Sequence, residues 1–132
     1  MSQETKLGVE QNVAGLLCYM PCGIGVVFSV IAAVVEKGNR FIRFHAFQSL
    51  LLHGIAIVLG FGYQVFSVIL YAVLPWSLYN LWRLAGLFAF GAVLIFLALL
   101  VVLILKANNN EEFKLPIIGK MAAKWAQVQG EP

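Results

Sequence analysis

The sequence predicts an all-α polytopic membrane protein, and three features lead to this prediction. Of the 132 residues, 61% are hydrophobic and only 11% are charged, and the mean hydropathy is +0.89. A soluble globular domain contains about 25% charged residues. Residues 13–35, 46–82 and 84–105 contain no charged side chain, and about 20 apolar residues are enough for a helix to cross the hydrocarbon core.

We predict a single membrane domain with three transmembrane helices, at residues 13–35, 49–74 and 84–105. The middle uncharged stretch is too long for one crossing, and Pro75 divides it because proline ends a helix. Trp76, Tyr79 and Trp82 follow, and such aromatic residues collect at membrane boundaries. We therefore expect a short interfacial turn between the second and third spans.

An interfacial lead-in over residues 40–48 precedes the second span and contains arginines and phenylalanines in close succession. Asn39 is a suitable cap for a helix that begins here and continues without a break into the span. Arg40 and Arg43 lie one helical turn apart, where they can contact lipid headgroups. The polar residues that follow them are not explained by anchoring alone.

The distribution of basic residues predicts the orientation. With three spans, the loop after the first span and the C-terminal tail lie on one side and together hold seven basic residues: Lys37, Arg40, Arg43, Lys106, Lys114, Lys120 and Lys124. The opposite side holds Lys6 and Arg83. Because cytoplasmic segments carry an excess of Lys and Arg, we expect a cytoplasmic C-terminus and a translocated N-terminus.

The tail, residues 113–128, is expected to form an amphipathic helix. Its apolar side chains fall on one face: Ile117, Ile118, Met121, Ala122, Trp125 and Val128. Lys120 and Gln127 fall on the other side. A helix of this kind lies in the plane of the interface with its lysines near anionic headgroups, so membrane lipids are expected partners. A partner protein is the alternative occupant of the apolar face.

Small residues at steps of three and four along the first span predict a helix-packing face. These residues are Gly15, Cys18, Cys22, Gly25 and Ser29. In lipid, helices associate by close packing, which small side chains allow. Proline 21 is expected to kink this span.

The second span carries a stripe of polar and small residues at the same steps: His45, Ser49, His53, Ala56, Gly60, Gln64, Ser67 and Tyr71. Polar groups that face lipid without partners are costly, so this stripe should face other helices or another protein. In one interpretation the stripe forms hydrogen bonds within the bundle. In the other, His53 and Gln64 line a conduit, or His45 or His53 is the axial ligand of a tetrapyrrole such as haem.

Three segments carry a resemblance to a known family: NVAGLLCY at 12–19, EKGNRFIRFHAFQS at 36–49 and KLPIIGK at 114–120. The most specific pattern consists of Glu36, Lys37, Arg43, Phe44, His45, Gln48 and Ser49. The sequence resembles a prokaryotic family of small, uncharacterised multi-pass membrane proteins related to the twenty-kilodalton subunit of the chloroplast inner-envelope import translocon. The resemblance implies three or four helices, a place in the prokaryotic cytoplasmic membrane and no enzymatic activity. It implies a protein-conducting role only for the chloroplast relatives.

The residues themselves also argue against catalysis. The sequence has no set of serine, histidine and carboxylate, no metal-binding cluster and no phosphate-binding loop, and too little water-exposed chain for a nucleic-acid surface. We therefore expect a non-catalytic accessory or structural subunit of a larger membrane complex, of respiratory, photosynthetic or translocation type. The alternatives are a translocon-like or channel component that works as an oligomer, and a pigment- or haem-binding subunit that uses His45 or His53.

Overall fold

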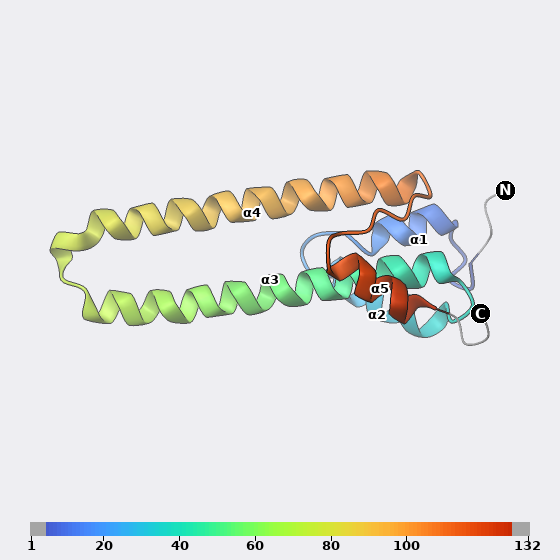
Figure 1. The fold of residues 1–132 in the computed structure, drawn as a ribbon, viewed down its shortest axis with the longest axis horizontal. Helices are drawn as coiled ribbons and strands as arrows, with labels where there is room; N and C mark the ends of the chain where they lie inside the picture. Colours follow the sequence, from blue (N-terminus) through green and yellow to red (C-terminus); the bar gives the residue numbers. More distant parts are fainter. Residues whose placement is uncertain (1–4, 128–132) are drawn as a thin grey trace.

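The computed structural model describes residues 5–127 and contains only helices over this range. Their bounds are α1 Gln11–Leu17, α2 Ile24–Val35, α3 Arg40–Val73, the 3-10 turn η1 Trp76–Leu78, α4 Tyr79–Asn108 and α5 Ile118–Ala126. The long helices α3 and α4 form a hairpin, and α1, α2 and α5 surround the end where α3 begins and α4 ends (Figure 1). We call this end the base, with residues 40–53 of α3 and 96–108 of α4. The rest of α3 and α4, residues 54–73 and 79–95, is the stalk.

Helices α3 and α4 are the two helices of the described chain that are long and apolar enough to cross a membrane. Helix α3 begins after Asn39, whose side-chain oxygen accepts a hydrogen bond from the backbone N–H of Ile42 at 3.2 Å. This confirms the predicted cap and the unbroken continuation of residues 40–48 into the second span. Helix α4 contains the predicted span 84–105 but starts earlier, at Tyr79, so the connector between the two spans is shorter than we predicted.

The predicted first span, residues 13–35, is wrong as a transmembrane helix. It is divided into α1 with 7 residues and α2 with 12 residues, and both are shorter than the roughly 20 residues needed for a crossing. Proline 21 breaks the helix where we predicted only a kink. Cys22 and Gly23 follow with φ of 64° and 82°, a left-handed conformation that reverses the chain direction. The segment is a short helical hairpin, and the protein has two candidate spans in place of three.

Helix α5 covers a shorter part of the tail than the predicted residues 113–128, and it packs against the first part of α3 (Figure 1). The reason is a face of small residues, because Gly119, Ala122 and Ala126 are buried while Phe44 packs against the two alanines. Residue 128, the last residue of the predicted tail helix, lies outside the described range.

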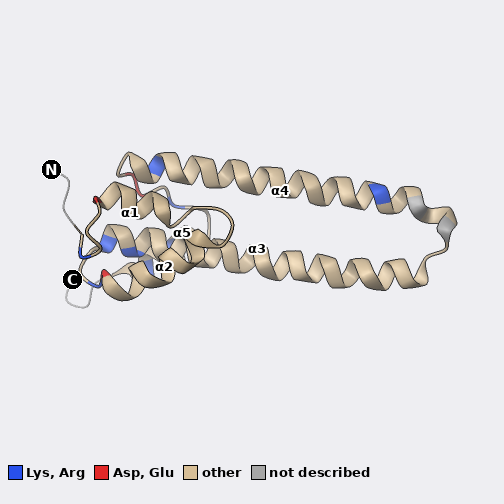
Figure 2. Ribbon diagram, turned by 180° about the vertical axis from the view of Figure 1, so that it is seen from behind, with Lys and Arg blue, Asp and Glu red and all other residues tan. Residues whose placement is uncertain are grey.

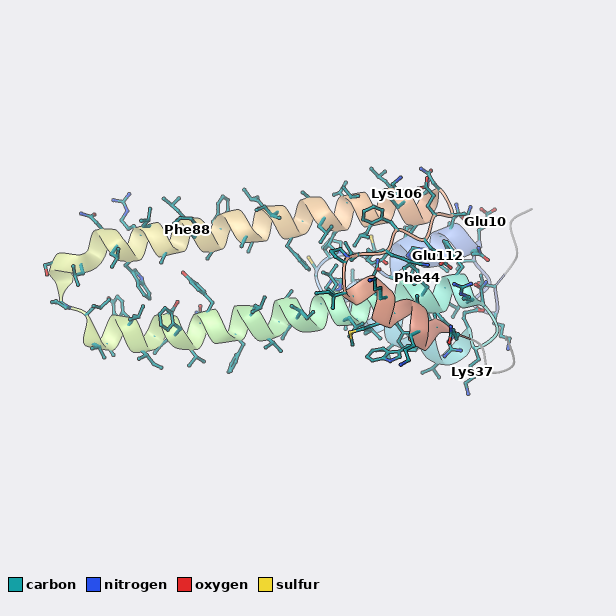
Figure 3. All side chains as sticks on the ribbon, viewed as in Figure 1. Glu10, Lys37, Phe44, Phe88, Lys106 and Glu112 are labelled. Carbon is teal, nitrogen blue, oxygen red and sulfur yellow. The ribbon has the colours of Figure 1, made fainter. Side chains whose placement is uncertain are left out.

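The base collects most of the charge. Figure 3 labels Glu10, Lys37, Lys106 and Glu112, and all four lie there. Basic residues are concentrated at the same end, and one lies near the start of α4, at the far end of the stalk (Figure 2); by sequence this is Arg83. The predicted separation of the N-terminus from the C-terminus depended on a third span, and the structure places both ends of the described chain at the base.

The buried core is also confined to the base. Tyr19, Leu52, Leu103 and Leu115 form one cluster that joins the α1–α2 linker, α3, α4 and the segment before α5. Burial of such side chains contributes about 25 cal/mol per Å² of apolar area removed from water. In the stalk the large apolar side chains are exposed; Phe61 and Phe88, for example, are 72% and 74% exposed. This surface fits the hydrocarbon of a membrane.

Candidate functional site

The base of α3 brings the polar residues of the sequence motif into the centre of the fold. His45, Gln48 and Ser49 are fully buried, and His53 is only 9% exposed. Residues three and four apart share one face of a helix, so these side chains form a single row. That row faces the α1–α2 linker, residues 18–23, and the segment before α5, residues 109–117. We call these four residues, together with Tyr19 and Arg43, the polar hub.

Gln48 connects three separate segments of the chain. Its side-chain N–H donates to the Tyr19 hydroxyl at 3.1 Å and to the Phe113 carbonyl at 3.0 Å. Its side-chain oxygen accepts a hydrogen bond from the backbone N–H of Leu115 at 3.3 Å. A buried amide that is satisfied in this way fixes the position of each partner. Gln48 therefore holds both the helical hairpin and the tail against α3.

Tyr19 continues the network to His45. The Tyr19 hydroxyl lies 3.0 Å from His45 Nδ1, and because it accepts a hydrogen bond from Gln48 it can donate its own proton to that nitrogen. Burial raises the pKa of the Tyr19 hydroxyl above its usual 10.0, which keeps this proton in place at neutral pH. His45 is then the neutral tautomer with its proton on Nε2.

Ser49 attaches the same face of α3 to the hairpin, and His53 bonds to Ser49 one turn away. The Ser49 hydroxyl donates to the Cys18 carbonyl, which also accepts from the Ser29 hydroxyl at 3.2 Å. His53 Nδ1 lies 2.9 Å from the Ser49 carbonyl, to which it can donate a proton. Burial raises the pKa of the neighbouring Cys18 thiol from 9.0 to about 12, so this thiol stays protonated. The Cys18 carbonyl thus joins α2, through Ser29, to α3, through Ser49.

Arg43 joins the hub to the end of α5. Its guanidinium donates to the Lys37 carbonyl and to the Trp125 carbonyl, each at 3.2 Å, and lies over the Phe47 ring. A cation at the last carbonyls of a helix satisfies groups that have no partner within the helix. Arg43 therefore fastens the C-terminal end of α5 to the start of α3.

The remaining residues of the family pattern, Glu36, Lys37 and Phe44, also contact other parts of the base. Glu36 is buried, and its carboxylate accepts a hydrogen bond from the backbone N–H of Leu7 at 3.0 Å. Phe44 is fully buried against α5. The Lys37 side chain is exposed, and its carbonyl is the part that Arg43 uses.

The predicted packing residues are divided between the base and the stalk. Gly15, Cys18, Gly25, Ser29, Ser49 and His53 lie in the base, where a side chain on Gly15 would meet Phe41 and His45. Cys22 is exposed at the turn of the hairpin. Gly60, Gln64 and Tyr71 are exposed in the stalk, and Ser67 is buried there. The stripe of polar and small residues in the second span is therefore divided between the buried base and the mostly exposed stalk.

Neither histidine has the open side that a tetrapyrrole ligand needs. The His45 ring is fully buried, with ring centroids of Tyr19, Phe41 and Phe44 at 5.6, 4.4 and 5.1 Å. His53 Nε2 has no hydrogen-bond partner among the described residues, but it is inaccessible to solvent, and the ring packs edge-on against Phe96. An axial ligand must present a nitrogen to a large flat macrocycle, so these two sites do not fit one as they stand.

Sequence reasoning missed Tyr19 and two backbone partners of the hub. Tyr19 is the one tyrosine in the first uncharged run, residues 13–35, and that position alone did not predict a role for it. The backbone groups of Phe113 and Leu115 carry no sequence signal of their own. Their partner Gln48 was the available sign, because a buried amide needs both donors and acceptors.

Comparison with known proteins places the chain in a family. Residues 6–122 match the MamF/MmsF family, described as the magnetosome magnetite crystal formation protein family. A UPF0132 membrane protein of Methanocaldococcus jannaschii is 36% identical over 124 residues, which cover 94% of this chain and 96% of the relative. Another, from Archaeoglobus fulgidus, is 32% identical over 114 residues, 86% of this chain and 93% of the relative. No solved structure matches. This chain therefore belongs to the MamF/MmsF-like family of small UPF0132 membrane proteins.

Proposed function

We propose that the protein is a non-catalytic membrane protein that serves as an accessory or structural subunit of a larger membrane complex, of respiratory, photosynthetic or translocation type. The polar hub supports the non-catalytic part. Arg43, Gln48 and Ser49 each bond to the chain's own backbone, and His45 bonds to Tyr19. Polar groups that are engaged in this way make a core specific and rigid. The hub atoms that lack a partner among the described residues, Nε2 of His45 and of His53 and Nε of Arg43, are buried away from solvent.

The main support for a role in a complex is that no other helix of the described chain packs around the stalk. Helices α1, α2 and α5 all pack at the base, so residues 54–73 and 79–95 have no other segment of the described chain around them (Figure 1). In this apolar surface Gln64 is exposed. A primary amide in hydrocarbon without a partner costs about 1–3 kcal/mol or more, so this position favours a protein neighbour over lipid.

The family description names magnetite crystal formation in magnetosomes. The described residues contain no group of three or more His, Cys, Asp and Glu side chains that could hold a metal ion. For this chain we propose a role in assembling membrane components, which is compatible with a mineral-forming compartment and with other membranes.

We further propose that both termini lie in the cytoplasm. With two spans, eight basic residues are on the side of the base and Arg83 is on the other side. The excess of Lys and Arg on one side favours a cytoplasmic base. This arrangement replaces the translocated N-terminus that three spans implied.

Anionic lipids are a second proposed partner of the base. On α5 the lysines Lys120 and Lys124 are exposed, and Met121 and Trp125 are exposed hydrophobic side chains on the same helix. Cations attract anionic headgroups, while apolar side chains enter the boundary between headgroups and acyl chains. The base is therefore suited to the headgroup region of the cytoplasmic leaflet.

A channel or translocon-like component is the second candidate function. The observation in its favour is that two polar side chains, Gln64 and Tyr71, are exposed on the apolar surface of the stalk. Two spans of one copy cannot enclose a pore, so this function requires an oligomer. A complex that contains only this chain would favour it.

Native mass spectrometry of the protein, extracted from its own membrane in a mild detergent, tests the proposed function. We expect a particle well above the 14.5 kDa of one chain that dissociates into this chain and other proteins. A single spectrum reports subunits and retained small molecules together. Recovery of this chain with no other protein, in several mild detergents, would contradict the proposal.

A further inference from the structure

The inner face of the stalk can be identified from contacts at its two ends. On α3, His53 packs against Phe96 of α4, with ring centroids 5.7 Å apart, and Tyr71 packs against Trp82, at 6.2 Å. Gln64 follows His53 by 11 residues, three helical turns, and precedes Tyr71 by seven residues, two turns. Gln64 therefore lies on the face of α3 that looks toward α4.

Between these two contacts Ser67 is buried, but the part of the inner face around Gln64 is open. Gln64 is exposed, and among the side chains that the structure describes none forms a hydrogen bond with its amide. A methyl group added at Gly60, one turn before Gln64, would meet nothing within 4 Å. On α4, the positions one and two turns after Trp82 are Ala85 and Ala89, which are small and partly exposed. The chain thus leaves the Gln64 amide and Gly60 exposed between its own spans, with the small residues Ala85 and Ala89 partly exposed on α4.

We infer that a second copy of this chain occupies the open face, so that two α3–α4 hairpins form a four-helix bundle around a two-fold axis. This inference deepens the proposed function by naming one neighbour of the stalk, and it rests on the proposal that the stalk has a protein neighbour. A two-fold axis brings the same surface of both copies together. Gln64 then faces its own counterpart.

The hydrogen-bonding groups of the Gln64 amide favour a second copy of this chain as the neighbour. A glutamine side chain carries two N–H donors and an acceptor oxygen, so two copies of Gln64 satisfy each other without any other polar residue. Lipid tails offer no hydrogen-bonding group. An unlike protein would need a polar group of its own at the same depth, whereas a second copy supplies one by symmetry. Gly60, Ala85 and Ala89 allow the close approach that membrane helices use for association.

The test is the lipid-dependent association of the full chain in vesicles, measured by energy transfer between copies labelled with donor and acceptor dyes at increasing lipid dilution. We expect a reversible dimer for the wild type. Interhelical hydrogen bonds in membranes contribute on average about 0.6 kcal/mol and at most about 1.7 kcal/mol, so Gln64→Leu should weaken association about 3- to 20-fold. Gln64→Asn keeps an amide and should retain more association than Gln64→Leu.

Gly60→Leu gives a second, independent variant. It adds bulk where the single chain has open space, so the fold of one copy should persist while close approach of two copies is blocked. Circular dichroism of each variant checks the fold. A wild type that stays monomeric at every dilution, or a Gln64→Leu variant that associates as tightly as the wild type, would overturn the inference.

The two proposals fail separately. A chain that is monomeric in vesicles but is recovered from its own membrane with other subunits would overturn the dimer and leave the proposed function standing. A Gln64-dependent dimer recovered with no other protein would support the dimer and contradict the larger heteromeric complex.

Discussion

Replacing Gln48 with leucine is expected to release the tail and α5 from α3. The substitution removes the hydrogen bonds to the Tyr19 hydroxyl, the Phe113 carbonyl and the Leu115 N–H. Each hydrogen bond contributes about 1 kcal/mol net, so we expect the loss of three bonds to destabilise the packing of the tail by about 3 kcal/mol. Leucine has a similar size, so the loss of hydrogen bonds accounts for the effect.

Limited proteolysis of the protein in vesicles measures this effect. Trypsin can cleave after Lys114, which lies within the segment that Gln48 holds. Where cleavage follows the population of the open form, the variant should be cut at least ~10-fold faster than the wild type. Gln64→Leu is the matched control, because it removes the same amide from the exposed stalk and should leave tail cleavage unchanged. Equal cleavage of Gln48→Leu and the wild type would show that the tail is held by other contacts.

Replacing Gly25 with alanine should open the helical hairpin. A methyl group at this position would collide with the backbone carbonyls of Met20 and Cys18 and with the Met20 nitrogen. Backbone atoms cannot move aside as a flexible side chain can, so we expect a cost of about 3 kcal/mol, at the upper end of that for overpacking. The Cys18 carbonyl would also shift away from the two serine hydroxyls that it accepts.

Thermal unfolding in detergent, followed by circular dichroism, measures the loss of stability. Gly38→Ala is the control, because it lies in the loop before α3 and an added methyl group there meets nothing within 4 Å. We expect the Gly25 variant to unfold at a temperature at least ~5 °C lower than the wild type, and the Gly38 variant to unfold within ~1–2 °C of it. Similar midpoints for both variants would mean that the turn between α1 and α2 is not closely packed.

The sequence predicted the helices that local rules determine. Asn39 was identified as a cap and Pro75 as a helix end, and both positions hold in α3. These features depend on neighbouring residues, which the sequence displays directly. The periodicity of the second span places His45, Ser49 and His53 on one side of a helix, and the structure buries these three residues in the base.

The errors have a common physical cause. Hydropathy alone cannot distinguish one long apolar helix from two short ones, and the turn at Pro21 depends on left-handed conformations at Cys22 and Gly23. The tail helix is shorter than predicted, and its packing on α3 through Gly119, Ala122 and Ala126 was not predicted. The residue pattern of the tail or of the first apolar run does not indicate contacts with residues far away in the sequence. The structure shows these contacts through the hydrogen-bond partners of Gln48 and Arg43.

The central claim is that the polar hub gathers both ends of the chain at the base, so that two spans cross the membrane and both termini lie on one side. A reporter active only in the cytoplasm and one active only in the periplasm, each fused in turn to the N-terminus and to the C-terminus, test it most directly. We expect the cytoplasmic reporter to be active at both ends and the periplasmic reporter at neither. Activity of the periplasmic reporter at the N-terminus alone would mean that residues 13–35 cross the membrane, and it would contradict the arrangement described.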